Sequence, residues 1–126
     1  MDLALSTHQA DDLAVVTVGG EVDLDTASQL GDHALEAVRD VSPHVVLDLT
    51  GVTFMDSTGL KVLLSIQRRA DLAGGSLAVA GATRSVLKIL ALTGLDQTFA
   101  LYDSLDDLPP APEATPPVSG GAAPTP

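Results

Sequence analysis

The feature that most constrains the fold of this chain is a junction between a strand-like and a helix-like pattern within residues 45–66. Residues 45–49 form a short run of valine and leucine around one aspartate, as is typical of a strand in the middle of a sheet. Over residues 60–66, leucine and isoleucine recur at roughly helical spacing, which predicts a helix with one buried face. Ser57 and Thr58 lie between the two patterns, so we expect the hydroxyl of one or the other at or near a helix N-terminus.

The alternation of short apolar runs and amphipathic stretches continues on both sides of this junction. The expected elements are strands over 3–9 and 13–19 that form a β-hairpin, a helix that begins after Asp25 or Thr26, a strand over 45–49, a helix over 57–73, a strand over 77–80, a helix from Thr83 to Gly94 and a strand over 98–102. Gly19 and Gly20 are expected to end the second strand. Strands that alternate with helices favour right-handed crossovers, so we predict an α/β fold with a mostly parallel sheet of about four or five strands and three or four helices.

Residues 1–105 and 106–126 differ in composition, which indicates one domain followed by a tail. Seven of the eight prolines lie in residues 109–126, together with Gly120 and Gly121. Such a segment buries too little apolar surface to offset the entropy lost when its backbone is ordered. We therefore expect a single domain over 1–105 and a disordered tail over 106–126.

The composition argues against several classes of function. The chain has 126 residues with no cysteine and 2% aromatic residues, which excludes thiolate chemistry and disfavours aromatic surfaces for base stacking. Its net charge of −11 opposes direct binding to nucleic acid. It shows no signal-peptide pattern and no apolar run close to the roughly 18 residues of a membrane span. We expect a soluble, cytoplasmic protein.

The charge is unevenly distributed along the chain. Residues 1–56 hold eleven acidic residues and one basic residue, whereas residues 57–95 hold five basic residues and one acid, Asp71. Two interpretations remain open: ordinary solvated helix faces, or a bipolar surface that orients a protein partner.

Neither a catalytic centre nor a metal site is predicted. The sequence around Ser57 is Met-Asp-Ser-Thr-Gly, which differs from the Gly-x-Ser-x-Gly of a nucleophile elbow, and no histidine is placed beside it. Glu21, Asp23, Asp25 and Asp56 could meet at one edge of the sheet, but their spacing lacks the glycine and the distal glutamate of a calcium-binding loop. No phosphate-cradling loop of the Gly-x-x-x-x-Gly-Lys type is present, and we predict no cofactor.

Two motifs, taken together, resemble one family. Gly20-Glu21-Val22-Asp23 is followed roughly thirty residues later by Asp56-Ser57-Thr58-Gly59-Leu60, after a valine-rich strand. With the order of the predicted elements over about residues 3–105, this pair resembles the STAS domain family and, within it, the bacterial anti-sigma factor antagonists. The family commonly shows Asp-Ser-Ser-Gly-Leu-Gly, and this chain has Thr58 and Lys61 at two of these places.

The resemblance implies a switch protein rather than an enzyme. Family members bind an anti-sigma factor that is also a serine kinase, and thereby release the sigma factor. The kinase phosphorylates a serine at the start of the second helix, which corresponds to Ser57, with Thr58 as an alternative acceptor, and a PP2C-type phosphatase restores the active form. The residues expected to contact the partner are Glu21, Asp23, Asp56, Ser57, Thr58, Gly59 and Lys61.

Other interpretations of these residues remain open. Ser57 could be a plain helix cap, Asp23 an acid in a turn, and Asp56 an acid that interacts with the helix dipole. Gly59 permits close approach of the backbone, and Lys61 could modify the choice of partner or stabilise a phosphate. The alternative function is a non-phosphorylated STAS interaction module of a signalling scaffold or a lipid-transport complex.

Overall fold

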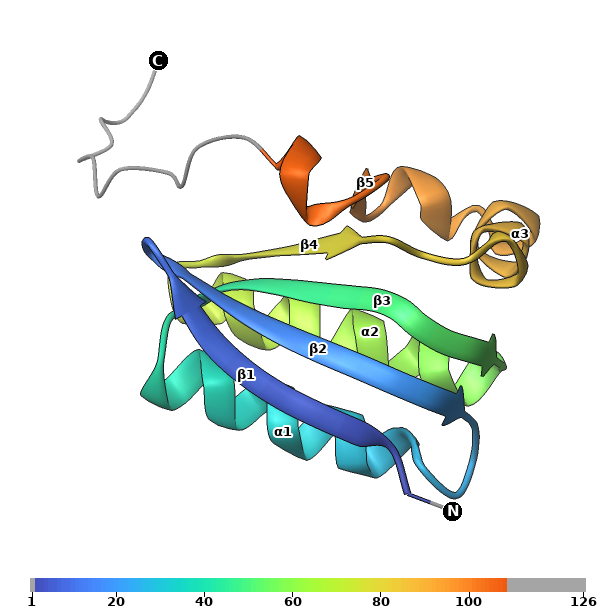
Figure 1. The fold of residues 1–126 in the computed structure, drawn as a ribbon, viewed down its shortest axis with the longest axis horizontal. Coiled ribbons are helices and arrows are strands. Elements are labelled where there is room, and N and C mark those ends of the chain that lie inside the picture. Colours follow the sequence, from blue (N-terminus) through green and yellow to red (C-terminus); the bar gives the residue numbers. More distant parts are fainter. Residues whose placement is uncertain (1, 109–126) are drawn as a thin grey trace.

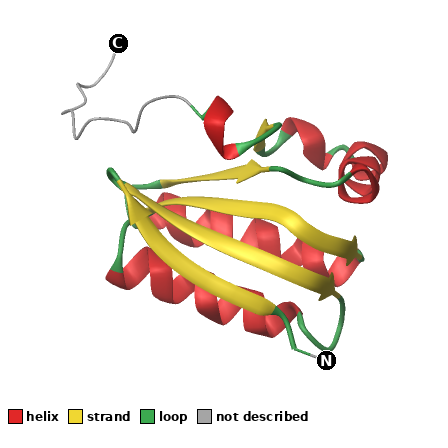
Figure 2. Ribbon diagram, in the orientation of Figure 1, coloured by secondary structure: helices red, strands yellow, loops and turns green. Residues whose placement is uncertain are grey.

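The computed structural model describes residues 2–108, which form a five-stranded sheet with α-helices packed along it (Figure 1 and Figure 2). The strands are β1 (Ala4–Ala10), β2 (Leu13–Val22), β3 (His44–Met55), β4 (Ser76–Ala80) and β5 (Ala100–Tyr102), and the α-helices are α1 (Ala27–Asp40), α2 (Ser57–Leu72) and α3 (Arg84–Thr93). The strand order is β1-β2-β3-β4-β5; β1 is antiparallel to β2, and the other neighbouring pairs are parallel. The predicted α/β fold with an N-terminal hairpin is therefore confirmed.

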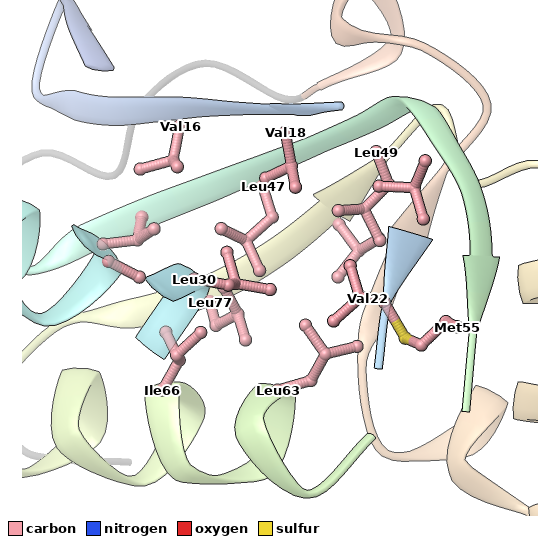
Figure 3. Close-up of a cluster of buried hydrophobic side chains, with 14 of the residues drawn as sticks. Val16, Val18, Val22, Leu30, Leu47, Leu49, Met55, Leu63, Ile66 and Leu77 are labelled. Carbon is pink, nitrogen blue, oxygen red and sulfur yellow. The ribbon is translucent and has the colours of Figure 1, made fainter. Parts of the chain in front are cut away.

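The main core lies between the sheet and the helices. Alternate residues of the central strands point to this side, and α1 and α2 cover it side by side (Figure 1). Figure 3 shows the strand side chains that meet Leu63 and Ile66 of α2. Val86 and Leu90 of α3 belong to the same cluster. The core is almost entirely aliphatic, as the scarcity of aromatic residues requires.

A second, smaller cluster lies on the opposite face of the sheet. Val15, Val46 and Ala80 are buried there, and Tyr102, Leu105 and Leu108 are among the residues that pack against them. A 3-10 helix, Leu105–Asp107, places the two leucines. Residues 106–108 of the expected tail are thus described together with the domain, whereas residues 109–126 lie outside the described residues.

Three strands differ in length from the expectation by two residues or more. The prediction that Gly19 and Gly20 end the second strand is wrong, because β2 continues to Val22 and pairs with β3 through register shifts around both glycines. Gly20 has φ +117°, a conformation that side-chain-bearing residues rarely adopt, so it bends the strand without ending it. β3 continues to Met55, well beyond residue 49, and β5 is shorter than 98–102.

The helix starts fall where the sequence predicts, but the threonine hydroxyls at two of them do not cap their helices. Thr26 and Thr83 occupy the N-cap positions of α1 and α3, and neither side chain bonds the amides of its helix. The Thr83 hydroxyl donates instead to the carbonyl of Val52, at 3.2 Å, and thereby joins the start of α3 to β3. The Thr26 hydroxyl bonds instead to Glu21 and Asp23, just before α1.

Candidate functional site

The predicted site residues come from two segments that the parallel pairing of β2 and β3 brings together. Both strands end at the same edge of the sheet, with Glu21 opposite Phe54 and Val22 opposite Met55. The amide of Asp56 donates to the carbonyl of Val22 at 3.2 Å, so the start of α2 is bonded to the end of β2. The two motifs therefore form one continuous surface.

Asp56 caps α2, and this corrects the interpretation of Ser57 as the cap. The Asp56 carboxylate accepts hydrogen bonds from the amides of Thr58 and Gly59, at 2.9 and 3.3 Å. These amides lie in the first turn of the helix, where N–H groups have no carbonyl partner within the helix. A carboxylate at this position also interacts favourably with the helix dipole. Ser57 is the first residue of α2 and is exposed to solvent, while Thr58 is half-buried.

The loop between β2 and α1 is held in one conformation by side-chain hydrogen bonds. The Asp23 carboxylate accepts from the amides of Asp25 and Thr26, at 3.0 and 3.2 Å. The buried Thr26 hydroxyl donates to the carbonyl of Glu21 at 2.6 Å and accepts from the amide of Asp23 at 3.0 Å. Asp23 therefore shapes the loop, as a turn acid does, and Glu21 remains exposed beside the start of α2.

Gly59 allows α2 to begin close to the ends of both strands. A Cβ atom at this position would lie 2.6 Å from Cγ of Met55 and 2.9 Å from Cγ1 of Val22. Figure 3 shows these two buried side chains next to each other, near the start of α2. Any larger side chain at position 59 would push the helix start, and Ser57 with it, away from the sheet.

The structure brings six of the seven predicted contact residues to this edge, at the end of β2, in the loop that follows it or at the start of α2. The seventh, Lys61, is one helical turn further along α2 and is exposed. Two apolar residues that the sequence analysis did not select also lie here. Leu24 projects from the loop with 78% of its surface exposed, and Phe54 is 46% exposed beside Glu21. The position of Leu24 between two aspartates in a loop was the signal that could have revealed it.

Three further features of residues 2–108 concern metal binding, membrane insertion and a surface groove. Within residues 2–108, no group of three or more histidine, aspartate or glutamate side chains is arranged to hold a metal ion. Over the same span, no helix has the length and apolar character needed to cross a membrane. A groove of about 790 Å³ lies between the ends of α1 and α2. Its lining includes Arg39, which donates hydrogen bonds to Asp40 and lowers the pKa of that carboxyl, and none of the predicted contact residues.

Comparison with known proteins places this arrangement in a family. The STAS domain family matches residues 4–108. The chain is 36% identical over 97 residues to the anti-sigma-F factor antagonist RsfB of Mycobacterium tuberculosis, covering 75% of this chain and 77% of that protein. It is 30% identical over 105 residues to the anti-sigma F factor antagonist of Paenibacillus polymyxa, covering 82% and 90%.

The solved structures agree with the sequence relatives. The crystal structure of an anti-sigma factor antagonist from Mycobacterium paratuberculosis superposes with a TM-score of 0.75 at 35% identity, covering 83% of this chain and 89% of that one. The match to the STAS domain family, over residues 4–108, includes both segments of the candidate site. The chain therefore belongs to the STAS domain family, and its relatives there are named anti-sigma factor antagonists.

Proposed function

We propose that this chain is a cytoplasmic anti-sigma factor antagonist that binds an anti-sigma factor with serine kinase activity and so releases the sigma factor. Phosphorylation of Ser57 ends this binding, and a PP2C-type phosphatase restores it. The observation that carries the proposal is an exposed serine at the first position of α2, next to the Asp56 cap and at the sheet edge where Glu21 ends β2 and Asp23 begins the loop. The names of the sequence relatives support the same role. The chain is then a substrate of the kinase and has no catalysis of its own.

The position of Ser57 suits it to accept a phosphoryl group. Its exposed oxygen can attack the γ-phosphorus of ATP while the hydroxyl proton passes to a base of the kinase and ADP leaves. Because Ser57 is the first residue of α2, the helix does not have to unfold to present it. The positive end of the helix dipole also favours the added negative charge.

The charge of the phosphate explains how modification would end binding. It adds about −1.5 to −2 charges next to Asp56, whose own carboxylate is held in place by two amides. The surrounding surface includes exposed Leu24 and Phe54, which a partner would cover, so the new charge would be taken out of water. An unpaired charge buried in an interface costs about 2–5 kcal/mol. This corresponds to a loss of affinity between about thirtyfold and several thousandfold.

Phosphate mapping with matched serine variants tests the acceptor. The purified chain is incubated with the candidate kinase and ATP, and the modified residue is identified by mass spectrometry. We expect phosphate on Ser57, no uptake by Ser57→Ala, and normal uptake by Ser65→Ala, which removes another exposed hydroxyl of α2. Normal uptake by Ser57→Ala, with loss in Thr58→Ala, would transfer the role to Thr58.

Binding measurements test the switch separately. We expect Ser57→Asp to weaken binding to the kinase and Ser57→Ala to leave it nearly unchanged, as measured by isothermal titration calorimetry. If Ser57→Asp and a stoichiometrically phosphorylated chain both bind as tightly as the unmodified chain, the electrostatic switch is rejected. A chain that binds no such kinase at all would favour a STAS module that acts without phosphorylation.

A further inference from the structure

We infer that Lys61 is the intramolecular counterion of a phosphate on Ser57, so that the chain itself stabilises its phosphorylated form. This inference rests on the proposed modification of Ser57. The two residues are four positions apart on α2, with Ser57 as the first helical residue, and both are exposed. Residues with this spacing are neighbours on the helix surface, and oppositely charged pairs there stabilise the helix.

The direction of helical side chains favours this contact. Every Cα–Cβ bond in an α-helix is tilted toward the helix N-terminus, so a long side chain covers the turn that precedes its own Cα. For Lys61 that preceding turn is the one that begins at Ser57. The ammonium group can therefore reach a phosphate at position 57 without any change in the backbone.

Lys61 has no competing carboxylate partner among the described residues. Within residues 2–108, the one ion pair closer than 4.0 Å joins Arg39 to Asp40, at the C-terminal end of α1. The charged groups nearest to Ser57 in the sequence and across the strand pairing are acids: Asp56 at the cap, Glu21 at the end of β2 and Asp23 in the loop that follows. In the first two turns of α2, Lys61 is the single cation.

Two other groups of cations have to be distinguished from Lys61. Arg68 follows eleven residues after Ser57 on α2, about 16 Å along the helix axis, which exceeds the screening length of about 8 Å at physiological salt. Arg84 and Lys88 lie on α3, which begins at the same edge of the sheet. The experiment therefore needs one control on each helix.

The test uses the full chain with phosphoserine installed at position 57 during translation, so no kinase is required. Phosphorus-31 NMR is used to titrate the phosphate, whose second pKa is ordinarily about 6. A nearby ammonium favours the dianion, so Lys61→Gln is expected to raise the second pKa by about 0.3, a twofold change in proton affinity. Lys61→Arg keeps the charge and is expected to preserve the lower value, while Arg68→Gln and Arg84→Gln leave it unchanged.

Two titration results would contradict the assignment of Lys61 as the counterion. If Lys61→Gln titrates at the same pH as the parent chain, or if Arg84→Gln produces the larger shift, Lys61 is not the counterion. A lysine with only a structural role would not change the titration of the phosphate. Because the phosphoserine is installed without a kinase, this failure is distinguishable from a failure of the proposed kinase reaction.

Discussion

Replacing Gly59 with alanine is expected to destabilise the protein, although alanine is the better helix former. The new Cβ would lie 2.6 Å from Cγ of Met55 and 2.9 Å from Cγ1 of Val22, whereas carbon atoms pack best at about 3.5–4.0 Å. Met55 and Val22 are 4% and 0% exposed, so neither side chain can move aside into solvent. The start of α2 would have to shift away from the sheet.

The size of the effect follows from two opposing terms. Overpacking a core lowers the free energy of unfolding by about 1–3 kcal/mol. Alanine in place of glycine within a helix raises it by about 1 kcal/mol. The expected net loss in the free energy of unfolding is therefore about 1 kcal/mol, with an upper value of about 2. For a domain of this size, each 1 kcal/mol lowers the Tm by about 4–8 °C.

Gly31 provides a matched control on the neighbouring helix. A Cβ at this position of α1 meets only Cγ1 of Val62 within 4 Å, at an ordinary 3.5 Å. Gly31→Ala is therefore expected to raise the free energy of unfolding by about 0.5–1 kcal/mol. Urea unfolding followed by circular dichroism measures both variants. If Gly59→Ala is stabilised as much as Gly31→Ala, α2 does not begin as close to Val22 and Met55 as described.

Substitutions at three further positions test the fold, each by urea unfolding. Asp56→Ala removes the cap of α2 and is expected to lower the free energy of unfolding by about 1 kcal/mol. Asp56→Asn retains a capping oxygen and should lower it much less. Equal losses in the two variants would show that the side-chain oxygen does not cap the helix. Thr26→Val leaves the Asp23 amide without its partner and should cost about 1–3 kcal/mol, whereas a neutral result would contradict the hydrogen bonds of the loop. Leu105→Ala uncovers the small cluster on the face of the sheet opposite the main core. It should lower the free energy of unfolding by about 1–2 kcal/mol, because only part of this side chain is buried. An unchanged stability would mean that the 3-10 helix does not cover that cluster.

Much of this site is visible in the sequence because it depends on local patterns. The helical spacing after residue 60 and the apolar run before residue 50 identify a strand followed by a helix, which places Ser57 close to a helix start whatever the rest of the fold. The identity of the cap was not visible in the same way. Asp56, Ser57 and Thr58 can each cap a helix, and the choice depends on where β3 ends, since the Asp56 amide is bonded to Val22 of a different strand.

The type and order of the elements can be predicted from the amino-acid sequence, because apolar periodicity is a property of neighbouring residues. The continuation of β2 through Gly20, the extension of β3 to Met55 and the exposure of Leu24 and Phe54 at this edge became visible only in the folded chain. Each of these depends on contacts between residues some thirty positions apart, which no local pattern contains. The candidate site exists because two parallel strands end at one edge, and that pairing brings the acidic loop to the first residue of α2.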